Sequence, residues 1–178
     1  GSILWSISEL QTDISDVIVN EINLLIQDLN KFTRFSGLSL SGSDHILTVN
    51  EVLLWQTGFP IRTSFANGFP VHDIDQFSTK KLLDGKDVDL VIWINSFSEK
   101  KIIINKKIKN VLIGTPTHPQ KNDVDIFIPV GTPGLDHNSH LLRVDKVVSM
   151  PLKKIRNISL PSVEQVLNKV KEGIINDN

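Results

Sequence analysis

The sequence contains no cysteine, and this absence excludes several classes of function at once. Without thiols the chain forms no disulfide, has no cysteine nucleophile, and cannot by itself hold a zinc ribbon or a cysteine-bound iron–sulfur cluster. No apolar run approaches the ~20 residues of a membrane-spanning helix. The net charge of −1 favours neither nucleic acid nor an anionic membrane. We therefore expect a cytoplasmic protein that binds neither.

The sequence also has a single methionine, Met150, and it begins with Gly1-Ser2. A natural chain starts with methionine, so we interpret this dipeptide as a cloning remnant and the chain as the C-terminal part of a longer subunit. A length of 178 residues suits one domain. We expect residues 1–13 to be remnant and lead-in, and residues 14–178 to form the body of a single α/β domain.

The clearest helical signal lies near the N-terminus. Apolar residues recur with steps of three and four at positions 14, 18, 22, 25, 29 and 32. This period predicts a helix over 14–32, with Ser15 or Asp16 capping its start and Gly37 just beyond its end. Shorter helices are predicted over 49–55 and over 76–83, the latter ending at Gly85.

A closing helix is predicted over residues 162–174. Ser162 and Gln165 have the spacing of a capping box, in which each side chain bonds the other residue's backbone N–H. Val163, Val166, Leu167 and Val170 make an apolar face, and Gly173 marks the predicted end.

Three segments have the pattern of strands covered on both faces. Residues 87–94, "DVDLVIWI", are apolar at consecutive positions and rich in β-branched side chains, and 111–113 and 125–128 have the same pattern. Residues 141–148 suit a further strand or one arm of a hairpin. Buried strands alternating with helices predict an α/β fold with three layers, a mainly parallel sheet flanked by helices.

The common catalytic motifs are missing from the sequence. It has no phosphate loop, dinucleotide fingerprint, nucleophile elbow or H-E-x-x-H pair. His137 and His140 have a spacing that would let both bind a metal on a helix. They follow Pro133-Gly134, however, so solvated loop histidines are favoured and we expect no metal site.

Two glycine-containing turns follow predicted strands and are the candidate cofactor-binding site. In an open parallel sheet ligands bind beyond the carboxyl ends of the strands. A turn there suits a phosphate or a pterin-like group, although a tight turn without a ligand explains the glycines equally well. The candidate residues are Gly114, Thr115, Pro116, Gly131, Thr132 and Gly134.

The loop "TGFPIRTSFANGFPVHD" contains two G-F-P triplets. Gly58 and Gly68 allow positive φ, so the loop is able to approach a ligand or a partner subunit closely. A rigid loop whose phenylalanines fill a core is an equal alternative. If the first interpretation holds, Arg62 and His72 are weak catalytic candidates that face the same cleft as the glycine turns.

The segment 124–152 resembles the last block of the pterin-binding large subunits of molybdenum and tungsten oxidoreductases. It is most similar to the B subunit of formylmethanofuran dehydrogenase, where a strand ending in proline is followed by G-[IL]-D and R-x-D. The matching residues here are Ile128-Pro129, Gly134-Leu135-Asp136 and Arg143-Val144-Asp145. "WQTGFPIRTSFANGFPVHD" and "SLPSVEQVLNKV" resemble other blocks of the family in the same order, and the likeness covers about residues 25–172.

The resemblance implies one of two activities. The archaeal branch is a dehydrogenase whose B subunit carries molybdopterin guanine dinucleotide with molybdenum or tungsten and an iron–sulfur cluster. The bacterial branch belongs to a complex that moves a formyl group from tetrahydromethanopterin to methanofuran and releases formate, and its B subunit resembles the dehydrogenase subunit without a redox centre.

This sequence is more similar to the bacterial branch, notably in "VVSMPLKKIRNISLPSVEQVL". Ser139 and His140 stand where many pterin-binding relatives have Gly-Thr, which removes a close backbone approach. The resemblance therefore implies a Rossmann-like domain without a cofactor that acts in structure and assembly beside other subunits. Arg143 and Asp145 are expected to pair within the fold or at a subunit contact.

Two other functions remain open at this point. One is the molybdenum- or tungsten-pterin domain of an oxidoreductase, which predicts a four-cysteine cluster motif in the full-length subunit. The other is a stand-alone α/β ligand-binding module, which predicts no further chain. The full-length sequence would separate all three.

Overall fold

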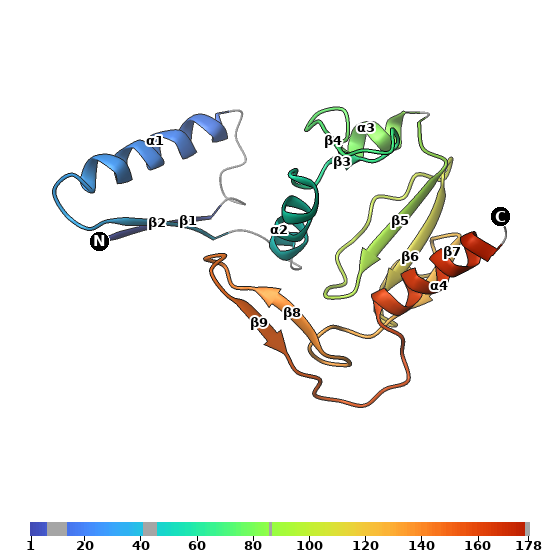
Figure 1. The fold of residues 1–178 in the computed structure, drawn as a ribbon. Coiled ribbons are helices and arrows are strands. Elements are labelled where there is room, and N and C mark those ends of the chain that lie inside the picture. The colour runs from blue at the N-terminus through green and yellow to red at the C-terminus, as the bar shows by residue number, and fades with distance from the viewer. Residues whose placement is uncertain (7–13, 41–45, 86, 177–178) are drawn as a thin grey trace.

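The computed structural model of the chain describes residues 1–6, 14–40, 46–85 and 87–176. Within these ranges helices and strands make a mixed α/β fold (Figure 1). The structure confirms this class and its parallel strands. It corrects the prediction of one mainly parallel sheet in three layers, because the strands are divided among four small sheets. Among the described helices, none combines the length and the apolar character that a membrane crossing requires.

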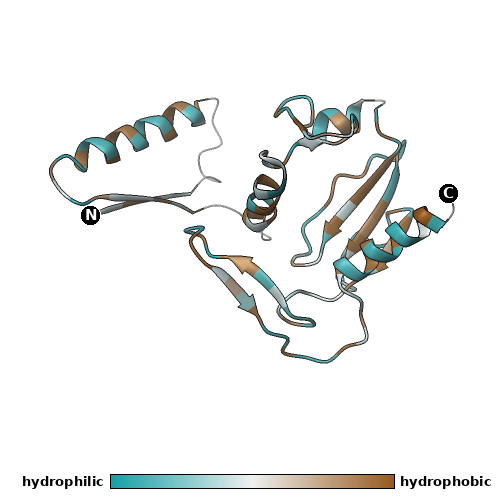
Figure 2. Cartoon of the chain, in the orientation of Figure 1, coloured by the Kyte–Doolittle hydropathy of each residue, from teal (hydrophilic) through white to brown (hydrophobic). Residues whose placement is uncertain are grey.

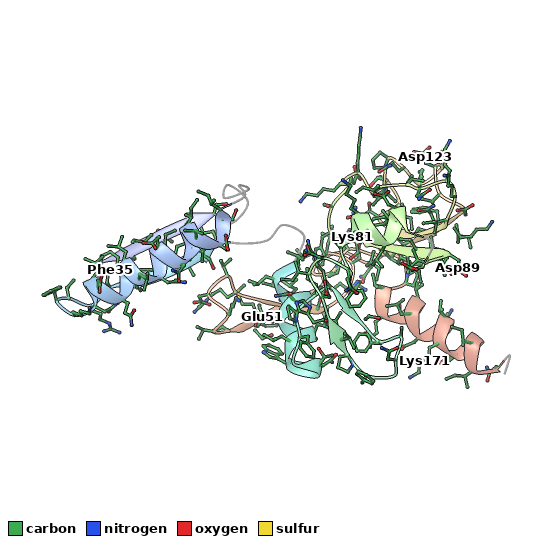
Figure 3. The ribbon with its side chains drawn as sticks, turned by 90° about the horizontal axis from the view of Figure 1, so that it is seen from above. Phe35, Glu51, Lys81, Asp89, Asp123 and Lys171 are labelled. Carbon is green, nitrogen blue, oxygen red and sulfur yellow. The ribbon has the colours of Figure 1, made fainter. Side chains whose placement is uncertain are left out.

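The N-terminal part is a β–α–β unit. Strand β1 (Ser2–Ser6) pairs in parallel with β2 (Ser36–Leu40), and α1 (Ser15–Leu29) connects them. Helix and sheet approach closely at Gly37, where a Cβ would lie 2.4 Å from Cδ1 of Ile26. Figures 1 and 3 show this unit projecting from the rest of the chain. The sequence predicted neither strand.

Helix α1 confirms the first predicted helix but differs at both ends. Ile14 is its N-cap, without a side-chain hydrogen bond, so the prediction that Ser15 or Asp16 caps the helix is wrong. At the other end the amide of Asn30 donates two hydrogen bonds of 2.7 Å to backbone carbonyls. These bonds fix the chain as it leaves the helix, which ends before the predicted Phe32.

The central sheet consists of three parallel strands. In order they are β5 (Leu90–Asn95), β6 (Lys109–Gly114) and β7 (Ile126–Pro129). They match the three strands that the sequence predicted. Hydrophobic residues run along β5 and β6, as the brown ribbon in Figure 2 shows. The register aligns the three strand ends, so the loops that follow begin at one edge.

Helix α4 (Val163–Asn176) packs on one face of this sheet. Its Val166 forms a buried cluster with Ile113 of β6 and Val130. Ile94 of β5 is paired with Ile113 and therefore points to the same face, but it stays 53% exposed. The helix thus covers β6 and β7 and leaves the face of β5 open.

The start of α4 is the predicted capping box. The Gln165 N–H donates to Oγ of Ser162 at 3.2 Å, and the Ser162 N–H donates to Oε1 of Gln165 at 2.9 Å. The helix continues through Gly173 to Asn176, so the prediction that Gly173 ends it is wrong.

We expect Ser162→Ala to lower the free energy of unfolding by about 1 kcal/mol, because the Gln165 N–H loses its acceptor. Urea denaturation measures this change. Ser149→Ala is a control without a helix-capping role, and an equal loss in both variants would contradict the assignment.

β8 (Ser139–Leu142) and β9 (Ser149–Leu152) form a hairpin, as one alternative predicted, but residues 143–148 are its turn rather than one of its arms. In its turn Nε of Arg143 lies 2.9 Å from both carboxylate oxygens of Asp145, and Nη2 lies 2.5 Å from one of them. These hydrogen bonds from Arg143 hold the pKa of the Asp145 carboxyl below its usual value. The prediction that the two residues pair within the fold is confirmed.

Helix α2 (Ile46–Thr57) extends the predicted helix at both ends and lies against this hairpin. The Leu142 N–H donates to Oγ1 of Thr48 at 3.0 Å. Nζ of Lys146 lies 2.6 Å from Oε1 of Glu51, whose side chain is only 10% exposed (labelled in Figure 3). A hydrogen bond and a partly buried ion pair therefore join α2 to the hairpin.

The segment between α2 and the central sheet holds two-residue strands and a short helix. β3 (Thr63–Ser64) pairs antiparallel with β4 (Val71–His72). Helix α3 (Thr79–Asp84) starts later than predicted, after its N-cap Ser78, and it ends at Gly85 as predicted.

Candidate functional site

A turn held by buried ionic hydrogen bonds follows β7. Both Oδ atoms of Asp136 are used: Oδ2 accepts from the Thr132 N–H at 2.7 Å and from Nη2 of Arg156 at 3.2 Å, and Oδ1 accepts from Nε of Arg156. The Asp136 side chain is 2% exposed. The hydrogen bonds from Arg156 hold the pKa of the Asp136 carboxyl below its usual value, against the effect of burial. Sequence patterns alone did not predict this pair.

A cavity of about 620 Å³ lies next to this turn, beyond the carboxyl end of β5. Parallel sheets place ligands at such an edge. Its walls come from α2, the end of β5 with the two residues that follow it, the segment that leads into β8 with the start of β8, and the start of α4. The lining residues are Val49, Ile94, Asn95, Ser96, Phe97, Pro133, His137, Asn138, Ser139, His140, Ser162, Val163 and Glu164.

His137 is the notable polar group of this lining. Its Nδ1 lies 3.1 Å from the Asn138 carbonyl oxygen, which only accepts, so Nδ1 carries the proton. In the neutral ring Nε2 is then an acceptor, and it is buried without a hydrogen-bond partner. A buried acceptor without a donor is uncommon and is satisfied by water or by a ligand.

The lining contains the Glu164 carboxylate and no lysine or arginine. The serine and asparagine side chains of the lining can both donate and accept hydrogen bonds. Without a lysine or arginine the cavity suits an uncharged polar group better than a phosphate.

The six predicted cofactor-binding residues lie beside this cavity, but none of them lines it. The protein itself fills the space that the three glycines leave. A Cβ on Gly114 would lie 3.3 Å from the Asn95 carbonyl oxygen, one on Gly131 would lie 2.9 Å from Cβ of Asp136, and one on Gly134 would lie 2.9 Å from Cβ of Leu152. Close packing thus accounts for the glycines, and cofactor binding by the six stays a prediction.

The other members of this set form turns. Oγ1 of Thr115 is buried without a hydrogen-bond partner, and the Pro116 carbonyl accepts from Nζ of Lys121 at 3.1 Å. The Thr132 carbonyl accepts from the Asp136 N–H at 2.9 Å. Pro133, between Thr132 and Gly134, is the member of the second turn that reaches the cavity.

Arg62 and His72 lie elsewhere, which corrects the expectation of a shared cleft. Arg62 lines a second cavity that has no lining residue in common with the first. The His72 ring stacks on Phe59 with 5.9 Å between centroids. Phe59, Phe65 and Phe69 are 39–59% exposed, so the alternative that the phenylalanines of this loop fill a core is wrong. A catalytic role for Arg62 or His72 stays a prediction.

Two further histidines, His118 and His140, lie in the described part of the chain, whereas His45 lies outside the described residues. His118 is fully buried, where its Nδ1 accepts from the Gln120 N–H at 3.2 Å and Nε2 lies 3.1 Å from the Lys100 carbonyl oxygen. His140 belongs to β8 and is exposed, so it does not share a helix face with His137. Among the described residues no group of three or more histidines or acidic residues is placed to hold a metal ion.

No protein-family model matches the chain. Two archaeal proteins, both B subunits of tungsten-containing formylmethanofuran dehydrogenase 2, are similar to it. The one from Methanocaldococcus jannaschii is 29% identical over 143 residues and the one from Methanococcus maripaludis is 27% identical over 144. Both alignments cover 78% of this chain, and they cover 32% and 33% of the relatives.

The B subunit of the formyltransferase/hydrolase complex Fhc from Methylorubrum extorquens is 25% identical over 112 residues, 62% of this chain and 31% of the relative. Among solved structures, the formyltransferase/hydrolase complex FhcABCD of the same organism, in complex with methylofuran, contains a chain with the same fold. Its TM-score is 0.77 at 21% identity, and the match covers 86% of this chain and 43% of that chain. The chain thus spans about a third of the length of the curated relatives it matches. These homologues confirm the resemblance found in the sequence.

Proposed function

We propose that this chain, a homologue of the B subunits of formylmethanofuran dehydrogenase and of the Fhc complex, is part of a structural and assembly subunit in a formyl-transferring complex. The complex would move a formyl group from tetrahydromethanopterin to methanofuran and release formate. One observation carries the proposal: the chain shares its fold with a chain of the FhcABCD complex and is homologous to the Fhc B subunit.

The use of the charged groups supports a structural role. Asp136, Asp145 and Glu51 are each paired with a basic side chain. A general acid or base must instead be free to reach its substrate and to exchange a proton. The two buried carboxylates of the described residues, Asp136 and Glu51, are therefore committed to holding loops and helices together.

Exposed apolar side chains support a place in a larger assembly. Phe32 is 89% exposed and Leu4 is 60% exposed, both on the β–α–β unit, and Trp55 of α2 is 64% exposed. Side chains of this kind concentrate where surface is covered in a complex.

Reconstitution tests the proposal. The full-length subunit is co-expressed with the other subunits of its complex, and the complex is sized by native mass spectrometry and assayed for formyl transfer and formate release. Omission of the subunit is expected to prevent assembly and to abolish activity. In the intact complex His137→Gln and Arg62→Gly are expected to leave kcat within about twofold. A fully assembled complex whose kcat falls about a hundredfold in either variant would contradict the structural role.

The second candidate is a tungsten- or molybdenum-pterin domain, which the names of the two archaeal relatives favour. The chain has no cysteine to bind a metal. The cavity lining has no lysine or arginine for the phosphates of a pterin dinucleotide, and Glu164 would repel them. These residues therefore do not fit the whole cofactor. Elemental analysis and pterin fluorescence of the intact native protein separate the candidates, since a stoichiometric signal would overturn the structural role.

A further inference from the structure

The second cavity, of about 870 Å³, lies between the β3–β4 hairpin, helix α3 and the segment that enters β5. This volume is within the range of small-molecule sites. The lining residues are Arg62, Thr63, Ser64, Ala66, Gln76, Phe77, Lys81, Leu82, Asp87 and Val88. In contrast to the cavity beside His137, this one has cationic side chains in its wall.

Arg62 has an unusual backbone. Its φ is +68°, in the left-handed region that non-glycine residues seldom occupy. Such a conformation costs on the order of 1–2 kcal/mol in a residue with a Cβ. Glycine would adopt it without that cost, as Gly58 and Gly68 do in the same loop. The strained position therefore carries a guanidinium where the backbone favours a glycine, and strain of this kind concentrates at functional sites.

The exposed side chain of Arg62 has one hydrogen bond to the protein. Its Nη1 donates to the Ile74 carbonyl at 2.8 Å. In the part of the chain that the structure describes, Arg62 forms no ion pair, so most of its N–H donors remain available at the cavity wall. A planar guanidinium with free donors binds a carboxylate through two parallel hydrogen bonds.

Lys81 adds a second positive charge from α3, where Figure 3 labels it. No hydrogen bond or ion pair is formed by its ammonium group with another described residue. Among the described residues of the lining Asp87 is the one acid, so the charged groups of the lining leave a net positive charge of one. The Asp73 carboxylate, outside the lining, is near enough for the charge of Lys81 to act on it. An organic anion with a single charge balances the cavity.

The remaining lining residues determine what uncharged part of a ligand fits the cavity. Phe77, Leu82 and Val88 supply apolar surface, and Thr63 and Gln76 supply polar groups at its side. Inorganic phosphate would leave the apolar surface uncovered. We propose that this cavity is a binding site for an organic carboxylate with an apolar or aromatic body, held by Arg62 and Lys81. The site is separate from the cavity beside His137 and does not depend on the proposed function.

Benzoate and benzamide test the proposal, because they have the same ring and nearly the same shape but differ in charge. Titration into the isotope-labelled 178-residue chain, followed by amide NMR shifts, gives the dissociation constant of each. Benzoate is expected to bind at least about tenfold more tightly than benzamide, because a charged hydrogen bond is lost in the amide. Inorganic phosphate, the third probe, is expected to bind more weakly than benzoate.

Three variants locate the site. Arg62→Gly removes the guanidinium at a position where glycine relieves the backbone, so folding is retained while benzoate binding weakens about tenfold or more. Lys81→Gln is expected to weaken binding several-fold. Lys80→Gln, the adjacent exposed lysine that is not part of the lining, is the matched control and is expected to change binding less than twofold. Equal binding of benzoate and benzamide, no binding of benzoate, or full binding by folded Arg62→Gly would each overturn the proposal.

Discussion

Asp136→Asn is expected to lower the free energy of unfolding by about 2–3 kcal/mol at neutral pH. The substitution keeps the shape of the side chain but removes the charge that accepts two hydrogen bonds from Arg156. An amide cannot accept at both ends, so its NH₂ group faces either Arg156 or the Thr132 N–H, which are donors themselves. Hydrogen bonds to charged groups contribute about 1.5–3 kcal/mol, and a buried polar group left without a partner costs a similar amount.

The loss of stability caused by Asp136→Asn should become smaller as the pH falls. Because the pKa of Asp136 is lowered in the folded state, its contribution is complete above the ordinary carboxyl pKa of about 4 and is lost as pH falls through the lowered value. The difference between the wild type and Asp136→Asn is therefore largest near neutrality and shrinks in acid.

Urea denaturation at several pH values measures this effect. Asp145→Asn is the matched control, because Asp145 also pairs with an arginine but in a solvated turn, where ion pairs contribute little. Equal losses of stability in the two variants would contradict the idea that burial increases the contribution of the Asp136–Arg156 pair to the free energy of unfolding.

Gly134→Ala is expected to destabilise the fold by about 3 kcal/mol, the second large effect. Gly134 has a φ of +74°, which costs an alanine about 1–2 kcal/mol. The new Cβ would also lie 2.9 Å from Cβ of Leu152, so strand β9 must move. Overpacking of this kind costs about 1–3 kcal/mol.

Gly58→Ala measures the cost of the positive φ without the steric cost of a new contact. Gly58 has a similar φ of +81°, but a Cβ there would have no neighbour within 4 Å. Its expected cost is therefore the backbone contribution of about 1–2 kcal/mol alone. Thermal and urea unfolding compare the variants, and a Gly134→Ala loss no greater than that of Gly58→Ala would contradict a close contact between the turn and β9.

The local patterns of the sequence predicted the central sheet and most helices. Consecutive apolar residues identified β5, although the prediction that protein covers both of its faces is wrong, since the face of Ile92 and Ile94 is about half exposed. The spacing of Ser162 and Gln165 identified the start of α4, since a capping box is formed by residues three apart. The motif R-x-D correctly predicted that Arg143 and Asp145 pair.

Other features depended on contacts that no local pattern encodes. β1 has only three consecutive apolar residues and β2 is more than half serine and glycine, so neither segment has the long apolar pattern of the central strands. Arg156 has no local signal that assigns it to Asp136. The cavity beside His137 combines four segments, and its polar groups became visible only when the turn after β7 brought His137 to the first turn of α4. The glycines that suggested a cofactor are explained by close packing, which the sequence alone does not distinguish from ligand contact.

The joint between α2 and the β8–β9 hairpin has a consequence for folding kinetics. The hydrogen bond from Leu142 to Thr48 connects residues 94 positions apart. Closing a loop of that length costs entropy before the contact is made, so contacts of long sequence separation form late on the folding pathway. The central sheet and α4 join segments that are closer in sequence. Amide hydrogen exchange should therefore find the α2–hairpin joint opening as a unit of low local stability while the core around Ile113 remains protected.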